Sequence, residues 1–431
     1  MKCNARNGEE EKSSKKKWLE YIPGGLFTTT LLFGTGYLIK MFFRMAWGYR
    51  RDLFYIMRKK GWRSAYSFFY TKMFVPVGEG AGAAWYFLFG PIVRRFPKLA
   101  PFPRYIEMEH TTVCPYRCIM CEHTYWQDQE ERMMPFEEFK SLIDQFPGLH
   151  WAHLTGEGSS FFNPDFIKMV EYVKEEKKAS VYMVDSFNDI KEEYMKKLID
   201  FCVEGVYISI DAATAETYQK IRVGCNFNRV VENVRKFIHL KREHKAVVPE
   251  ISFRFIIMTH NVHEVPKFLD LVHSFGTMKD FGKGSRIDFV GNLEYPEVKN
   301  FSVYELPDDI IKETLEKAKN YGFNVFLSHT EPKKNPCIEQ CYAWLEPYVM
   351  MDGYVVSCCN TLMSNKRAFL KKHAFGHLKE NSFTKIWNSE RYRKFRETVN
   401  KKDRQVPIIC TGCRAYNWTD RAKKYGIDKG L

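Results

Sequence analysis

The chain has 431 residues, of which 45% are hydrophobic, so it is long enough for two or three domains with a large core. Its formal charge of +14 is uneven, because residues 1–104 hold 19 Lys and Arg against 6 Asp and Glu, while residues 105–431 are almost neutral. The basic region also holds 23 Phe, Tyr and Trp, far more than a solvated tail for nucleic acid needs, and we therefore expect no nucleic acid partner.

The first 93 residues combine basic, aromatic and apolar side chains, which is typical of a membrane interface. Residues 24–39 form an uncharged run of 16 residues, which as a helix would cover roughly 24 Å of a hydrocarbon core roughly 30 Å thick. A second uncharged run, residues 81–93, is shorter. We expect residues 1–93 to be a helical membrane-associating region that lies in or re-enters the membrane. A single crossing and ordinary core helices remain alternatives.

The cysteine pattern indicates metal ligation. The chain has 12 cysteines, several of them closely spaced, and no recognisable cleavable signal peptide, which favours metal sites in a reducing compartment over a disulfide framework. We therefore expect the protein on the cytoplasmic side of the membrane. Cys3, Cys202 and Cys225 have no partner at ligand spacing, which favours a structural role for them.

Proline-rich residues 94–104 are expected to form a linker. After them, apolar strand-like runs alternate with amphipathic helical runs, which predicts an α/β fold with a parallel sheet. The expected strands are residues 105–109, 151–155, 179–184, 205–210, 250–258 and 286–290. The expected helices are residues 135–146, 164–177, 190–201, 228–242 and 262–275. In such folds the carboxyl ends of the strands place the functional site.

Three cysteines, Cys114, Cys118 and Cys121, lie within eight residues just after the first expected strand. This spacing lets three thiolates meet on one four-iron cluster (4Fe-4S) and leaves one iron open for another ligand. The motif resembles that of the radical S-adenosylmethionine (SAM) superfamily, although Met120 stands where that family usually has an aromatic residue. A zinc knuckle or ferredoxin-type cluster would need another cysteine nearby, and three unrelated core cysteines are the remaining alternative.

The resemblance implies a partial (β/α)6 barrel over residues 105–330 and a set of SAM-binding residues. Gly156 and Glu157 resemble a family motif whose backbone and acidic side chain hold the SAM ammonium, unless they form an ordinary turn. Ser209 and Arg222 resemble family residues that bind the ribose and carboxylate of SAM. Asp211 is expected to shape the same strand end. The alternative for these polar residues is capping of the following helix.

A second group of cysteines with ligand spacing lies near the C-terminus: Cys341, Cys358, Cys410 and Cys413. Asp352-Gly353 predicts a tight turn that brings the first two of them together. Residues 331–431 resemble a SPASM region, or its shortened form called Twitch, in which four cysteines bind one auxiliary 4Fe-4S cluster. A zinc site with four cysteines is the alternative. Cys337 and Cys359 are spare and can replace an assigned ligand.

The resemblance implies an iron–sulfur oxidoreductase or modifying enzyme that cleaves SAM reductively to a 5'-deoxyadenosyl radical, which abstracts a substrate hydrogen. The auxiliary cluster would then accept an electron, which favours dehydrogenation or cross-linking. We expect a reduced electron donor of the ferredoxin or flavodoxin type, a membrane lipid surface as partner, and a membrane-resident or lipid-linked substrate. A peptide- or protein-maturing enzyme is the alternative, and a membrane-bound electron carrier with two clusters is the non-enzyme alternative.

Overall fold

The structure is a computed structural model, and it describes residues 39–40, 42–74, 96, 99–126, 128–293, 295–328, 345–363, 365–399 and 407–410. The chain divides into two units, Met1–Trp47 and Gly48–Leu431. In the first unit residues 42–47 are helical, and Phe42, Phe43 and Trp47 are exposed. Everything described below belongs to the second unit.

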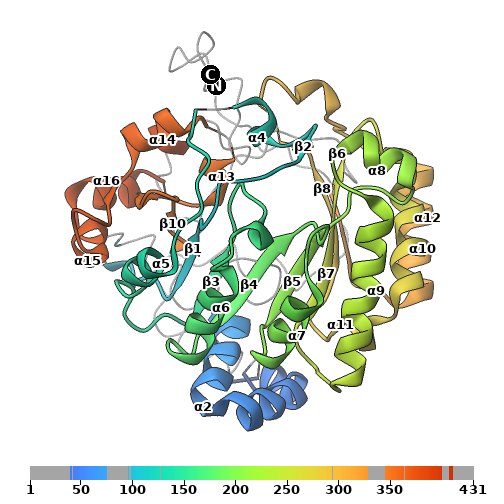
Figure 1. Ribbon diagram of the computed structural model, residues 1–431, viewed down its shortest axis with the longest axis horizontal. Coiled ribbons are helices and arrows are strands. Elements are labelled where there is room, and N and C mark those ends of the chain that lie inside the picture. The colour runs from blue at the N-terminus through green and yellow to red at the C-terminus, as the bar shows by residue number, and fades with distance from the viewer. Residues whose placement is uncertain are drawn as a thin grey trace, which may run out of the picture. The chain divides into compact units, whose positions relative to one another are not determined.

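A ten-stranded sheet forms the centre of the second unit, in the order β12-β11-β10-β1-β3-β4-β5-β7-β8-β9 (Figure 1). Its six central strands are parallel neighbours: β1 (Tyr105–Met108), β3 (Trp151–Leu154), β4 (Ser180–Asp185), β5 (Gly205–Ser209), β7 (Glu250–Ile257) and β8 (Ile287–Gly291). These are the six strands that the sequence predicts, each within one residue at either end. The predicted parallel α/β sheet is therefore confirmed.

The five predicted helices also form: α5 (Phe136–Ile143), α6 (Phe166–Glu175), α7 (Glu192–Asp200), α9 (Phe227–Glu243) and α10 (Val265–Phe275). Their apolar residues recur at helical spacing. In α7, for example, Met195, Leu198 and Ile199 are buried, and the exposed face is charged. Three shorter helices lie between the strands: α4 (Glu122–Tyr125), α8 (Ala215–Ile221) and α11 (Met278–Phe281).

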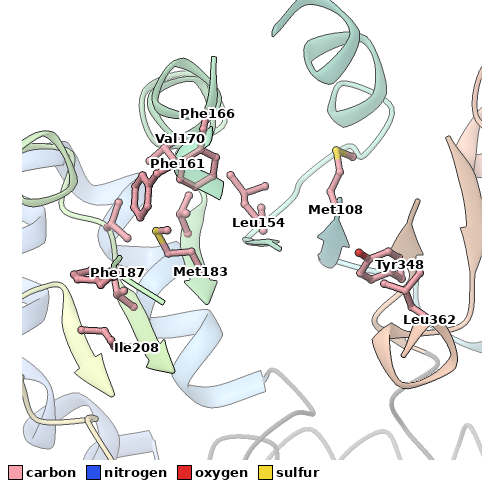
Figure 2. Packing of buried hydrophobic residues seen from close by; sticks show 14 of the residues in the cluster. Met108, Leu154, Phe161, Phe166, Val170, Met183, Phe187, Ile208, Tyr348 and Leu362 are labelled. Atoms are coloured by element: carbon pink, nitrogen blue, oxygen red, sulfur yellow. The ribbon is translucent and has the colours of Figure 1, made fainter. Parts of the chain in front are cut away.

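One face of the sheet is apolar and is covered by helices. Leu154, Met183 and Ile208 point from three neighbouring strands toward this side and are fully buried. Figure 2 shows Leu154 and Met183 near Phe166 and Val170 of α6. Each such side chain contributes about 1.5–3 kcal/mol when it leaves water, so this face holds the helices on the sheet.

The opposite face is polar, because successive residues of a strand point to opposite sides. Glu107 and His153 are register partners on β1 and β3, and His153 Nδ1 lies 3.0 Å from Glu107 Oε1. The Tyr105 hydroxyl donates to the same carboxylate at 3.2 Å. Arg254 and Asp288 are register partners on β7 and β8. Charged and aromatic side chains therefore line this face from β1 to β8.

The sheet continues beyond the six predicted strands at both edges. After α12 (Asp308–Tyr321), strand β9 (Val325–Leu327) pairs with β8. At the other edge β10 (Tyr348–Val349) pairs in parallel with β1, and β11 (Tyr354–Val356) and β12 (Gly376–His377) follow it. The sequence did not predict these strands, because two or three residues are too few to show an alternating pattern.

The described strands of the C-terminal region, β10, β11 and β12, all belong to the barrel sheet. The predicted Asp352-Gly353 turn joins β10 to β11, and Gly353 adopts a φ of 100°, which favours glycine. Four helices follow: α13 (Cys359–Leu362), α14 (Arg367–His373), α15 (Phe383–Trp387) and α16 (Glu390–Val399). The domain limits at residues 93, 104 and 330 stay a prediction, but strands from before and after residue 330 belong to the same sheet.

Helix α2 (Arg50–Phe74), which bends at Gly61, is the described part of the N-terminal region within this unit. Its Ile56 and Phe68 are fully buried against Cys202 and Val248. In this part of residues 1–93 the buried side chains pack as in an ordinary core helix, which was one of the alternatives given above. The uncharged run at residues 81–93, and all of residues 24–39 except Ile39, lie outside the described residues. Within the described parts of the chain, no helix is long and apolar enough to cross a membrane.

Candidate active site

The three closely spaced cysteines lie on the loop that leaves the carboxyl end of β1, near α4 and β2 in Figure 1. Cys114, Cys118 and Cys121 are all partly exposed, and the Cys121 N–H donates to the Cys118 carbonyl at 3.0 Å. Strand β2 (Arg117–Cys118) pairs with β6 (Arg222–Val223), so that Cys118 stands opposite Arg222. The fold thus joins the cysteine loop to a residue predicted for SAM binding.

The thiols of this loop influence one another. Burial raises the pKa of Cys114 to about 12 and that of Cys121 well above its usual range, and a charged Cys118 adds to both effects. The Cys225 thiol hydrogen-bonds to Cys118 and lowers the pKa of Cys118 to about 7. Cys225, for which the sequence predicts only a structural role, therefore lies beside the loop. The position of Cys225 in the sequence does not indicate its contact with Cys118, because that contact depends on the pairing of β2 with β6.

This donor set fits a 4Fe-4S cluster. Three thiols lie on one loop at the carboxyl ends of the strands, and as thiolates they repel one another until a cationic centre binds them. In the described part of the chain, no three Cys, His, Asp or Glu side chains already form a metal site. The assignment of these three ligands stays a prediction.

The glycine loop after β3 lies against the end of β1. A Cβ atom at Gly156 would stand 2.6 Å from Cγ of Glu109, and one at Gly158 would stand 2.6 Å from the carbonyl oxygen of Thr111. Neither position accepts a side chain without movement of its neighbour. Both glycines are therefore required by the close packing of this loop against the end of β1.

Glu157, the acidic residue of this loop, already has a cationic partner. Its side chain is 8% exposed, and its carboxylate lies 2.9 Å from Nη2 of Arg367. Burial raises the pKa of Glu157, and the Arg367 charge opposes that effect. The predicted contact between Glu157 and the SAM ammonium stays a prediction, but an acidic side chain does stand at the predicted place.

The other predicted SAM residues meet at the ends of β5 and β6. Ser209 ends β5 and is 8% exposed, and Asp211 follows it fully buried with a φ of 61°. The Asp211 carboxylate accepts from Nε of Arg222 at 2.8 Å, from Nη2 of Arg222 at 2.5 Å and from the Ile256 N–H at 2.7 Å. Asp211 therefore orients Arg222, and its predicted part in the SAM site stays a prediction.

The sequence reasoning missed two carboxylates at the same edge of the sheet. Asp185 ends β4, accepts from the Phe187 N–H at 2.7 Å, and has a pKa raised to about 6 by burial, which the nearby Arg222 charge partly opposes. Glu109 follows β1 and is fully buried. Both could have been found from the expectation that the carboxyl ends of parallel strands place the site, since each is a polar residue at such an end.

Half of the predicted auxiliary ligand set is described. Cys358 precedes α13 and is 7% exposed, and Cys410 ends the short helix η7 (Ile408–Cys410) and is 6% exposed. The spare Cys359 hydrogen-bonds to the Glu107 carboxylate, so this cysteine segment lies at the polar face of β1. Three cysteines of the C-terminal region lie outside the described residues: Cys337, Cys341 and Cys413. Both described cysteines are buried, and the ligand set stays a prediction.

Comparison with protein families gives two matches. Residues 108–272 match the radical SAM superfamily, and residues 337–414 match SPASM, described as an iron–sulfur cluster-binding domain. Among curated relatives, a "Tungsten-containing aldehyde ferredoxin oxidoreductase cofactor-modifying protein" of Pyrococcus furiosus is 28% identical, with 75% of this chain and 91% of the relative covered. An "AdoMet-dependent heme synthase" of Methanosarcina barkeri is 22% identical, with 73% and 91% covered.

Solved structures of similar fold include Streptococcus suis SuiB bound to S-adenosylmethionine. It has a TM-score of 0.54 and 12% identity, with 80% of this chain and 82% of SuiB covered. Native anSMEcpe with bound AdoMet has a TM-score of 0.50 and 14% identity, with 74% and 95% covered. At these identities the likeness concerns the fold alone.

Proposed function

Because this chain belongs to the radical SAM superfamily and carries a SPASM iron–sulfur cluster-binding domain, we propose that it modifies a polar, cofactor-type small molecule by radical chemistry. The observation that carries this proposal is the polar face of the barrel sheet. This substrate differs from the membrane-resident or lipid-linked one that the N-terminal composition suggests. The curated relative from P. furiosus, whose name describes cofactor modification, supports the same class of substrate.

The polar face can reach solvent and is suited to a polar ligand. The side chains of Arg254 and Arg286 are 33% and 31% exposed, and their shared partner Asp288 is buried. On the opposite wall, Oε2 of Glu107 and Nε2 of His153 are buried without a protein hydrogen-bond partner among the described residues. Burying a polar group without a partner costs roughly 2–7 kcal/mol, so a hydrocarbon chain here would be opposed by these groups.

The proposed roles of the chain's residues follow from their positions. Cys114, Cys118 and Cys121 hold the first cluster, which when bound supplies the electron that cleaves SAM to the 5'-deoxyadenosyl radical. The Gly156 loop lets the backbone approach SAM closely, and Arg222 binds the SAM carboxylate in the orientation set by Asp211. Because the polar face lies directly below these residues on the same strands, a substrate held there can present a hydrogen to the radical.

The experiment that tests the proposal supplies the anaerobically reconstituted protein with SAM, a ferredoxin or flavodoxin, and fractions of cell extract. We expect a fraction of small polar molecules to stimulate 5'-deoxyadenosine formation and to contain the compound that is consumed. Stimulation by the lipid fraction alone would support a membrane-resident or lipid-linked substrate. Stimulation by the peptide fraction alone would support the peptide- or protein-maturing alternative. No SAM cleavage under any condition would leave the electron-carrier alternative.

The auxiliary ligands give a separate prediction. We expect Cys410→Ala and Cys413→Ala proteins to lose about four irons but to keep SAM cleavage without product formation, because the barrel residues alone make the radical. Iron analysis and 5'-deoxyadenosine assays measure the two effects. Stoichiometric zinc in the unaltered protein, with iron for one cluster only, would instead support the four-cysteine zinc site.

We further propose that the protein attaches to the cytoplasmic membrane surface through exposed residues of α2. Phe54 and Trp62 are 60% and 67% exposed, and basic Arg58, Lys59 and Arg63 beside them are also exposed. Aromatic and basic side chains together suit an anionic lipid surface. A bilayer that contacts α2 would lie away from the cysteine loop, because α2 packs at the amino ends of the strands, where its Lys72 pairs with Glu250, the first residue of β7, at 2.5 Å.

Membrane attachment can be measured with the full-length protein and vesicles. We expect Arg58→Glu with Lys59→Glu to weaken binding to phosphatidylserine vesicles at least tenfold, since each basic residue near an anionic surface contributes about 1 kcal/mol. Lys312→Glu with Lys319→Glu on exposed α12 is the matched control, because it changes the charge equally elsewhere. Equal weakening by both pairs would show that net charge matters and the α2 surface does not.

A further inference from the structure

Arg367, the first residue of α14, is buried between the two domains that the family matches define. Its side chain is 2% exposed. Nη1 donates to Oε2 of Glu109 at 2.8 Å, and Nη2 donates to Oε1 of Glu109 at 2.6 Å. This parallel two-bond geometry is the strongest arrangement available to an arginine and a carboxylate, and it fixes the plane of both groups.

The same guanidinium also binds the glycine loop of the SAM site. Nε of Arg367 donates to Oε1 of Glu157 at 3.1 Å. Glu109 in turn accepts from the backbone N–H of Glu157 at 3.2 Å and from that of Met351 at 3.0 Å. One arginine of the SPASM domain therefore holds the end of β1 and the loop after β3 in a single hydrogen-bonded group.

This group contains more acidic side chains than basic ones. Glu109, Glu157 and the nearby Glu122 are buried carboxyl groups, and Arg367 is the cation that acts on all three. Burial raises the pKa of Glu157, and the Arg367 charge opposes that rise. Arg367 thus offsets part of the effect of burial on Glu157 and fixes the direction in which this carboxyl group points.

We propose that Arg367 is a positioning residue for SAM, through which the SPASM domain sets the orientation of Glu157 in the radical SAM domain. The inference rests on the proposed role of Glu157 toward the SAM ammonium. SAM is a cation at its sulfonium and ammonium groups, so it suits a site in which two or three carboxylates surround one arginine. When SAM binds, the ammonium shares Glu157 with Arg367, and Glu109 keeps the arginine in place.

This arrangement couples the two domains. A change that displaces α14 weakens the hold on Glu157, and SAM binding in turn stabilises the position of α14, because such coupling is reciprocal. The sequence offered no sign of it, since Arg367 stands 210 residues after Glu157 and belongs to no motif.

The test compares three full-length proteins, each reconstituted anaerobically. Arg367→Gln removes the charge and the two parallel hydrogen bonds to Glu109. Arg367→Lys keeps the charge without the two parallel bonds, and Arg396→Gln is the matched control. Arg396 is 1% exposed in the same domain and donates to the Trp387 carbonyl at 3.0 Å, within the C-terminal region. The measurements are iron content, the KM for SAM in 5'-deoxyadenosine formation, and the change that SAM causes in the electron paramagnetic resonance spectrum of the reduced first cluster.

We expect Arg367→Gln to keep both clusters, to raise the KM for SAM at least tenfold and to weaken the SAM-dependent spectral change, with Arg367→Lys intermediate. Arg396→Gln is expected to change the KM less than twofold. An unchanged KM in both Arg367 variants, or an equal rise in the Arg396 control, would overturn the inference. Loss of cluster iron from both Arg367 variants would also overturn it, because the residue would then serve cluster loading. Failure of the unaltered protein to cleave SAM would instead contradict the proposed function.

Discussion

Replacing Cys114, Cys118 and Cys121 together by alanine is expected to abolish SAM cleavage. These three residues are the cysteines of the loop after β1, and their thiolates are the proposed ligands of the only cluster with an open iron. Without it no electron reaches SAM, so the 5'-deoxyadenosine formed should fall to the level of a protein-free reaction. The iron content should fall from about eight to about four, since the auxiliary cluster uses other cysteines.

The matched control for this loss is Cys202→Ala. Cys202 is buried beside α2 and Val248, far along the chain from the loop, and contributes only packing. We expect this variant to keep its iron and its SAM cleavage, with a modest loss of thermal stability. Undiminished 5'-deoxyadenosine formation by the triple variant would exclude the loop as the site of the first cluster.

The barrel could be predicted from the sequence because its pattern is long and regular. Six apolar runs separated by amphipathic helices specify parallel strands, and the strands form within one residue of the predicted limits. The edges could not be predicted in the same way. The two residues of β10 become a strand only because they pair with β1, and such a tertiary contact leaves no local pattern.

In the candidate site, too, residues within a motif could be predicted from the sequence, whereas contacts that depend on the complete fold could not. Cys118 and Arg222 were each recognisable from a motif, but the sequence does not show that β2 and β6 pair and bring them opposite each other. Cys225 and Arg367 belong to no motif, and each reaches the site through a contact that depends on the complete fold. Side chains that hold the ligand-binding residues are therefore harder to predict than those residues themselves.

Composition was least informative in the N-terminal region. Aromatic and basic residues there predicted a membrane surface, yet in α2 they divide between two roles. Phe68 is fully buried against the barrel, and Trp62 on the same helix is 67% exposed. A count of residue types cannot separate these roles, because the difference depends on which side of the helix packs against the amino ends of the strands. Deleting all residues before Pro101 would therefore remove part of the core together with any membrane contact.

Replacing Asp211 by asparagine is expected to cause the second large loss of activity. Arg222 would keep its buried position, with a side chain 9% exposed, but its charge would have lost the carboxylate that neutralises it. Breaking a buried ion pair in this way costs about 3–5 kcal/mol, which corresponds to a factor of about 10² or more in an equilibrium constant. The hydrogen bond from the Ile256 N–H can be kept, because the side-chain oxygen of asparagine accepts in the same way as that of aspartate.

We therefore expect the Asp211→Asn protein to form 5'-deoxyadenosine at least about 10²-fold more slowly at low SAM concentration, and to unfold at a lower temperature. Asp189→Asn is the matched control: its partner Arg229 is 57% exposed, and an ion pair at the surface contributes about 0–1 kcal/mol. The control should stay within twofold of the unaltered protein in both measurements. If Asp211→Asn loses stability but keeps its KM for SAM, the pair serves the fold alone, and Arg222 must be removed from the proposed SAM site.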